Sequence, residues 1–299
     1  MFFRNLQIYR LPPGSTIAPD ALQEQLSRAV FQPCSSYARD SRGWIPPRGD
    51  DRLVFTLAQQ QLIALGTESK LLPASVVKQA VDERAADLER RMGVKPGPKR
   101  RRELKDEITD ELLPRAFSRY STTFAWIDPV DRWFVIDAAS PKQVESFMEV
   151  LRKSLDEVIV VPLKTERSAA AAMTEWLLAR EAPPGFTIDR ECELQSTQDE
   201  KATVRYLHHP LTDTGEIINH IRNGKAPTRL AMTWQDRLSF VLTAQLEVKR
   251  LAFLEVATAE AETEGASDDE RFEADFVLMT GMLAKFLDDL TRVIGIAAD

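Results

Sequence analysis

The chain has 299 residues, of which 43% are hydrophobic and 28% charged, and its formal net charge is −7. This length exceeds that of an average domain, so we expect one large or two medium domains with complete hydrophobic cores. The composition excludes an intrinsically disordered chain, and no apolar run approaches the roughly 18 residues that a membrane-spanning helix needs. The two cysteines, Cys34 and Cys192, form no CxxC motif, which is typical of a reducing compartment and predicts a cytoplasmic location.

The first 165 residues are predicted to form an α+β region, because short alternating apolar runs are interspersed with helical periodicity. Residues 39–51 have the composition of a loop. The predicted elements are a strand over 3–9, a helix over 19–30, a β-hairpin over 53–57 and 61–65, strands over 122–127 and 133–136, a helix over 141–155 and an apolar strand over 158–161.

Two further helices are predicted between these strands. Val77, Val81 and Ala85 recur at helical spacing after Pro73, and Gly93 with the following Pro-Gly-Pro ends this helix. The second helix runs from about Arg100 to Leu113, and Pro114 breaks its pattern. The two helices predict a helical hairpin, inserted at about residues 73–117, with basic residues at its tip.

A second α+β region is predicted over residues 166–299, after a boundary near 163–169. The acidic start of its last helix suits the positive end of the helix dipole. The predicted elements are a helix over 169–179, strands over 186–194 and 202–207, a helix over 215–223, β-rich runs over 228–253 and a final helix over about 269–294, with Phe272, Phe276, Met279, Leu283, Phe286, Leu287 and Leu290 as its buried stripe.

The charges are unevenly distributed along the chain. Residues 255–275 hold nine acidic residues and one basic residue, and all other residues together sum to +1. The acidic total therefore leaves room for a phosphate-binding surface elsewhere. The strongest candidate for such a surface is a run of basic residues interrupted by prolines. The alternative is that this run is only the solvated start of a helix. Its cations are Lys95, Lys99, Arg100, Arg101, Arg102 and Lys105.

No catalytic, cofactor or metal site is predicted. The three histidines include no HExxH motif, and Asn223-Gly224-Lys225 lacks both the first glycine and the hydroxyl of a phosphate-binding loop. The acidic pairs Asp268-Asp269 and Asp288-Asp289 leave a metal-dependent nuclease as an alternative, although such pairs on helices are usually solvated.

Ten separated motifs, in one order along the whole chain, resemble the RdgC family of bacterial recombination-associated proteins. Their number makes a chance similarity improbable. The motifs are FFRNLQIYRL, GWIPP, LLPASVVKQA, ELLPRAFSRYS, WID, LRKSL, MTEWLLA, EIINHIRNGK, LAMTWQDRLSFVL and RFEADFVLMTG.

The resemblance implies an α+β fold with an elongated, crescent-shaped subunit, closed into a ring-shaped homodimer. It implies duplex DNA held through the ring with little sequence preference, and antagonism to the strand-exchange recombinase by occupying its DNA. It also implies a nucleoid-associated protein without enzymatic activity, cofactor, small-molecule substrate or membrane partner. A rival hypothesis is a regulator that binds the recombinase directly through the acidic residues 255–275.

The resemblance also assigns roles to the segment PRAFSR. Phe117 is expected near one of the two contacts that close the ring; the alternative is a core aromatic residue. Arg115 and Arg119 are expected to contact phosphate, and the alternative for them is a salt bridge to Asp110 or Glu111.

Three further DNA-binding candidates lie in the second region. His208 and His209 stand in a loop where the family is expected to be more basic, so this loop's grip on DNA is in doubt. They could bind phosphate weakly and with pH dependence, or be plain loop residues. Lys225 ends the motif EIINHIRNGK and is included as a candidate.

Overall fold

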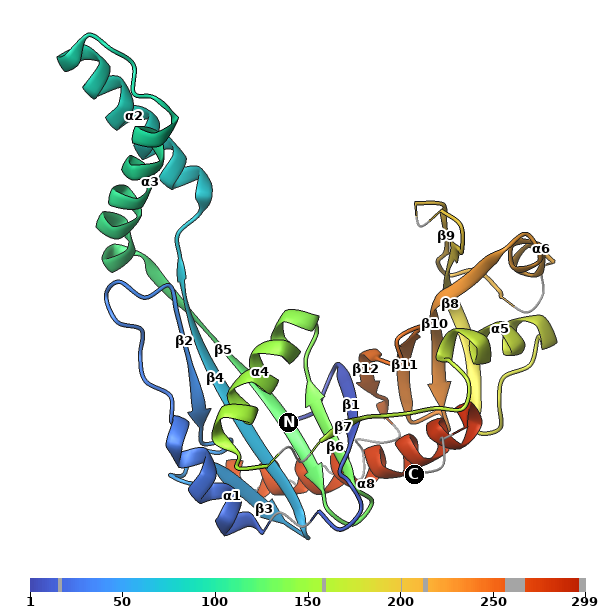
Figure 1. Cartoon of the computed structure of the whole chain (residues 1–299). Helices are drawn as coiled ribbons and strands as arrows, with labels where there is room; N and C mark the ends of the chain where they lie inside the picture. Colours follow the sequence, from blue (N-terminus) through green and yellow to red (C-terminus); the bar gives the residue numbers. More distant parts are fainter. Residues whose placement is uncertain (16–17, 158–159, 200, 212–214, 256–266, 296–299) are drawn as a thin grey trace.

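The structure is a computed structural model that describes residues 1–15, 18–157, 160–199, 201–211, 215–255 and 267–295. Figure 1 shows an elongated, curved molecule with mixed α/β structure, in which a pair of helices projects at one end and a long helix lies along the outer side. The α-helices are α1 (Pro19–Leu26), α2 (Ala74–Met92), α3 (Pro98–Leu112), α4 (Pro141–Ser154), α5 (Ala169–Ala179), α6 (Glu216–Arg222) and α8 (Asp268–Ile294).

One large antiparallel sheet joins the two halves of the chain. In the described residues it has 12 strands in the order β2-β4-β5-β6-β1-β12-β11-β10-β8-β9, with β3 paired to β4 and β7 to β1. The strands are β1 (Leu6–Arg10), β2 (Asp40–Ile45), β3 (Val54–Leu57), β4 (Gln60–Leu71), β5 (Phe117–Asp128), β6 (Trp133–Asp137), β7 (Val161–Pro162), β8 (Phe186–Ser196), β9 (Thr203–Tyr206), β10 (Lys225–Trp234), β11 (Leu238–Thr243) and β12 (Val248–Phe253).

The central strand β1 pairs with β6 from the first half and with β12 from the second. The sheet is therefore continuous across the predicted boundary near residues 163–169. The division into regions 1–165 and 166–299 stays a prediction.

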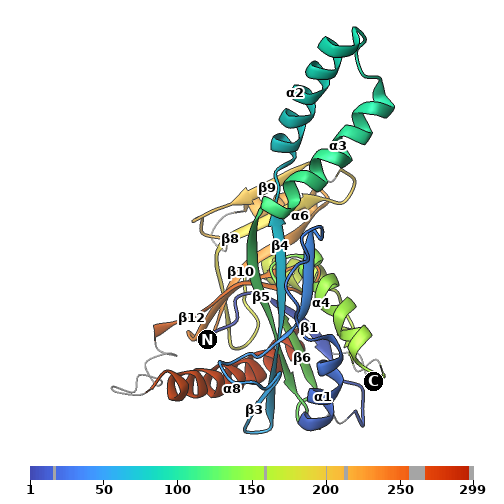
Figure 2. The same ribbon diagram turned by 90° about the vertical axis from the view of Figure 1, so that its left-hand side faces the viewer.

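Helices cover the two faces of the sheet differently. Figure 2 shows α8 on one side of β4 and β5, and α1 and α4 on the other. On the α8 side, the buried ring of Phe286 meets those of Phe240, Trp234 and Phe186 at 4.9, 5.8 and 6.4 Å. On the other side, Phe147 of α4 packs edge-on against Trp44.

The α1 and α4 layer covers only the first half of the sheet. Side chains alternate along a strand, so Leu230 and Met232 of β10 join the core under α8, while Arg229 and Ala231 lie on the opposite face. We call this opposite face of β8, β9, β10, β11 and β12 the open face, because no helix of the described residues packs on it.

The acidic start of α8 is tied to the first half of the chain. Arg48 donates hydrogen bonds to Asp269 (3.0 Å) and Glu273 (2.7 Å), and the hydrogen bond from Arg48 holds the pKa of Asp269 below its usual value. The N-terminal amine of Met1 pairs with Asp275, and Glu270 completes a capping box with Ser267. These acids therefore have structural roles.

Most predicted elements are present, but the loop predicted over residues 39–51 is wrong, because β2 pairs with β4 from Asp40 to Ile45. Its Asp, Ser and Gly residues favour strands poorly, and the pairing with β4 overrides this preference. A Cβ atom on Gly43 would lie 2.4 Å from the Cα atom of Phe31, so only glycine fits there. Of the strand predicted over 158–161, residues 158–159 lie outside the described chain, and the exposed Val161 belongs to the short β7.

Candidate nucleic-acid interface

Residues 74–112, which we call the arm, consist of α2, α3 and their connection. The helices pack through a small core of Val77, Val81 and Ala85 with Leu104 and Ile108. They stand on the extended ends of β4 and β5, whose pairing continues as far as Leu71 and Phe117. Figure 1 shows this stem carrying the arm away from the rest of the sheet.

The predicted location of the basic run at the tip is correct only for Lys95, which lies in the connection. Arg101 pairs with Asp82 in the first half of α2. Arg101, Arg102 and Lys105 also line a cleft of about 440 Å³ with Ala74 and Lys78 at the start of α2, so the prediction is wrong for this part of the run. These cations lie on the flank of the arm because α3 begins beside the middle of α2 rather than beside its end.

The cations of the arm differ in how strongly they are held. Arg100 donates to Glu103 (3.1 Å) and Glu107 (2.8 Å), and these hydrogen bonds raise its pKa above the usual value. Arg101 is held by Asp82. In the described part of the chain, Lys95, Lys99 and Arg102 are exposed and have no ion pair, so they can meet phosphate without first losing a partner.

Phe117 stands at the base of the arm with 84% of its surface exposed. The alternative interpretation of Phe117 as a core residue is therefore wrong. Its register partner Leu71 is 50% exposed on the same face of the stem, whereas Tyr120, which is 65% exposed, lies on the opposite face. The stem thus carries an apolar patch, which is the kind of surface that a partner covers.

Arg115 and Arg119 flank this patch and are exposed. The alternative of a salt bridge to Asp110 or Glu111 is not realised in the described residues, and Glu111 instead accepts from Arg84 at 3.2 Å. Arg119 lies opposite Ser69 in the stem. Both arginines therefore remain candidates for phosphate contact.

Glu68 fixes the stem to the preceding loop. Ser118 donates to one oxygen of its carboxylate at 2.5 Å, and the backbone amide of Cys34 donates to the other at 2.7 Å. These hydrogen bonds, led by that of Ser118, lower the pKa of Glu68 below its usual value. The base of the arm is thereby held in one orientation.

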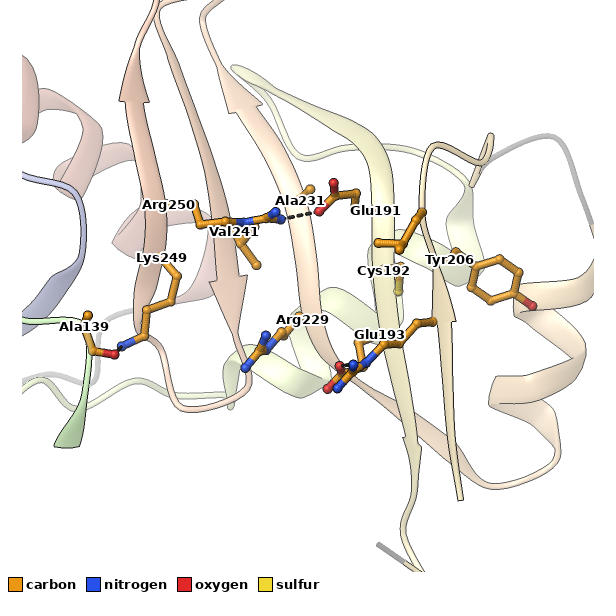
Figure 3. Close-up of a pocket in the computed structure, with 12 residues that line it drawn as sticks. Ala139, Glu191, Cys192, Glu193, Tyr206, Arg229, Ala231, Val241, Lys249 and Arg250 are labelled. Atoms are coloured by element: carbon orange, nitrogen blue, oxygen red, sulfur yellow. Dashed lines mark hydrogen bonds and ion pairs between the residues drawn. The ribbon is translucent and has the colours of Figure 1, made fainter. Parts of the chain in front are cut away.

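A second set of cations lies on the open face. There a pocket of about 410 Å³ has Ala231 and Val241 in its lining, as Figure 3 shows. Around these two small side chains stand cations from three strands. They are Arg205 of β9, Arg229 of β10, and Lys249 and Arg250 of β12.

Three of these four cations have acidic partners. Arg205 pairs with Glu193 at 2.5 Å, Lys249 lies 3.3 Å from Glu247, and Arg250 pairs with Glu191. Burial raises the pKa of Glu193, but hydrogen bonds from Thr228 and Arg205 outweigh burial and leave this pKa below its usual value.

Arg229 differs from these three, because it is exposed and forms no ion pair with the described residues. The sequence gives little signal for the open-face cations, since an arginine on the polar side of a strand is ordinary.

The histidine pair does not form one site. His208 is exposed, has a positive φ of 54° and borders a second hollow on the open face. His209 stacks on Tyr206 at 5.4 Å between ring centroids. Lys225 begins β10 opposite Ser196 and is half-buried. Of these three candidates, only His208 is brought beside the open-face cations.

One acid of each pair proposed for a nuclease makes structural contacts. Asp289 accepts from the indole nitrogen of Trp234 at 3.0 Å and from Arg292 at 2.8 Å, while Asp269 is paired with Arg48. Within the described ranges, no group of three or more His, Cys, Asp or Glu residues is placed to hold a metal ion. In the same ranges, no helix combines the length and apolarity needed to cross a membrane.

Comparison with known proteins decides the family. The family model described as "Putative exonuclease, RdgC" matches residues 1–297. The chain is 50% identical to the recombination-associated protein RdgC of Dechloromonas aromatica over 297 residues, which cover 99% of this chain and 98% of the relative. The chain belongs to the RdgC family.

Other members of the RdgC family are nearly as similar. The recombination-associated protein RdgC of Herminiimonas arsenicoxydans is 48% identical, and that of Cupriavidus pinatubonensis is 47% identical. Each alignment covers 99% of this chain and 98% of the relative. The resemblance stated from the ten motifs is thereby confirmed as family membership. The names of these relatives associate them with recombination.

Proposed function

We propose that the chain binds duplex DNA without sequence preference, as a homodimer closed into a ring, and restrains recombination by occupying DNA that the strand-exchange recombinase would use. The observation that carries the proposal is the placement of exposed, unpaired cations on two separate parts of the molecule. Lys95, Lys99 and Arg102 belong to the arm and Arg229 to the open face, the parts that rise on either side of α4 in Figure 1.

Counterion release explains why such cations suffice for binding. Each lysine or arginine that neutralises a phosphate frees condensed counterions, so affinity comes without contacts to bases and falls steeply with salt. The acidic pI of about 5.3 does not oppose this, because the net negative charge comes from residues 255–275 and the rest of the chain sums to +1.

The described part of that acidic segment supports DNA occupancy over direct recombinase contact. Asp269 and Glu273 are bound to Arg48, and Asp275 to the N-terminal amine, so a partner would have to displace internal contacts. The proposal implies that the protein is associated with the nucleoid and has no enzymatic activity.

Wild-type protein should bind labelled 30-base-pair duplexes of unrelated sequence with equal affinity. We expect log Kd to rise with log salt with a slope of about 5 to 9, which corresponds to roughly 6 to 10 phosphate contacts. Fluorescence anisotropy between 50 and 200 mM salt measures this. Absence of binding at 50 mM salt would contradict the proposal, and shortening of the DNA in the presence of Mg²⁺ would favour a nuclease.

Phe117 should be required for closing the ring. The substitution Phe117→Asp is expected to weaken self-association about 30-fold or more, since interface energy is concentrated in buried aromatic anchors. The fold should be unaffected, because 84% of the side chain is exposed in the single subunit. Sedimentation equilibrium measures the association.

Val130→Asp provides the control, because Val130 is 62% exposed at the turn between β5 and β6. Equal association of wild type and both variants would remove Phe117 from the interface.

A further inference from the structure

The open face carries acids as well as cations, and their arrangement is specific. Glu191 and Glu193 both come from β8, and each holds an arginine that would otherwise be exposed to solvent. Arg229, on the neighbouring strand, lies opposite Glu193 and helps to lower the pKa of that carboxylate, but it forms no ion pair with the described residues. The face therefore contains both held and free arginines.

The pair formed by Arg250 and Glu191 spans the face. Arg250 belongs to β12 and Glu191 to β8, and β11 and β10 lie between these strands in the sheet. Figure 3 shows the two side chains extending toward each other across the sheet, above Ala231 and Val241. Small residues on the two intervening strands leave the space for this contact.

The same pair separates two hollows. The pocket of about 410 Å³ and the second hollow of about 470 Å³ share Glu191, Ala231, Val241 and Arg250 in their linings. Opening the pair would join the hollows and release the guanidinium of Arg250. A DNA backbone following the face would then meet an additional cation.

The held arginines are accessible to a competitor. The side chains of Arg250 and Arg205 are 64% and 68% exposed, so water screens their ion pairs and each pair adds little to stability. A phosphate offers a guanidinium the same bidentate, charge-assisted contact as a carboxylate. Replacing the carboxylate by a phosphate as the partner of the arginine therefore changes the free energy little. The exchange leaves an unpaired carboxylate beside the DNA.

We infer that Glu191 and Glu193 limit the affinity of the open face for DNA by competing with phosphate for Arg250 and Arg205. This inference rests on the proposed function and specifies how the same surface is tuned. Arg229 makes phosphate contact directly, whereas the two held arginines contribute only after their carboxylates have been displaced.

The test compares wild type with the variant Glu191→Gln/Glu193→Gln. The variant should bind a 30-base-pair duplex about tenfold more tightly at 0.15 M salt, and its salt slope should be steeper by about 2, because two more cations then neutralise phosphate. A matched control, Glu24→Gln/Glu181→Gln, removes two exposed carboxylates outside the open face and should change affinity less than twofold.

A second variant separates competition from a general charge effect. Adding Arg205→Gln and Arg250→Gln to the first variant should abolish the whole gain, and thermal unfolding verifies that each variant is folded. Tight binding by wild type with no gain in the first variant overturns this inference alone, as does an equal gain in the control. Absence of binding by wild type and by every variant at 50 mM salt overturns the proposed function together with it.

Discussion

Replacing Lys95, Lys99, Arg102 and Arg229 together by glutamine is expected to lower the affinity for duplex DNA about a thousandfold at 0.1 M salt. These four cations are exposed and have no ion pair within the described residues, so each can neutralise one phosphate at no cost in lost partners. Removing four contacts per subunit should also flatten the salt slope by about 3 to 4 for each subunit that contacts the DNA. Fluorescence anisotropy across a salt series measures both quantities.

The matched control removes four other cations. Arg271, Lys285 and Arg292 lie on α8, and Arg52 lies two residues before the start of β3. Replacing them by glutamine gives the same net charge and should reduce affinity less than tenfold. If both variants lose affinity equally, binding depends on overall charge and the assigned surfaces are wrong.

Separating the four changes shows which surface dominates. The variant of the three arm residues should flatten the salt slope by about 2.7 for each subunit that contacts the DNA, because it removes three contacts per subunit. Arg229→Gln alone should flatten the slope by about 0.9 per subunit. If the arm variant keeps the salt slope of the wild type, the phosphate contacts lie on the sheet rather than on the arm.

Phe286→Ala should lower the free energy of unfolding by about 3 to 5 kcal/mol, the usual cost of removing a buried phenyl ring. Phe286 is fully buried, and its ring meets Phe240, Trp234 and Phe186 beneath the second half of the sheet. Urea unfolding, followed by the fluorescence of the five tryptophans, measures this loss.

Val277→Ala on the same helix provides the control, because Val277 is 48% exposed. Its cost should stay within about 0.5 kcal/mol, as is usual for surface substitutions. A loss below about 1 kcal/mol for Phe286→Ala would show that α8 is not a main support of the sheet.

Local periodicity was sufficient to predict the helices. The stripe that includes Phe276, Leu283 and Phe286 recurs at helical spacing in the sequence, and these residues are buried in α8. Such a pattern is visible without knowledge of the partner, since a helix buries one face whatever it packs on. The same holds for Val77 and Val81 in α2.

Strand β2 could not be predicted, because it depends on its partner strand rather than on a local pattern. Asp40, Ser41 and Gly43 are poor strand formers, and what makes them a strand is their pairing with residues 64–69 of β4. Gly43 is needed because Phe31 passes close by, a contact that no local pattern records.

The candidate interface was only half visible in the sequence. The cations of the arm form a run, which any charge pattern reveals. Arg205, Arg229 and Arg250 are isolated in the sequence and come together only when β9, β10 and β12 enter one sheet. The sequence also could not show that Asp82 and Glu107 hold two of the arm's arginines, because one of these contacts is tertiary and the other depends on the register of a helix.

The contact between the two ends of the described chain has a consequence for biosynthesis. The backbone amide of Phe3 meets the sulfur of Met279, and Phe3 and Leu6 belong to the same core as Leu283 and Leu290. The residues of α8 leave the ribosome after all strands of the sheet, so part of this core stays uncovered until α8 has emerged. Closure of the core therefore waits for α8, and the nascent chain needs protection of this apolar surface until then.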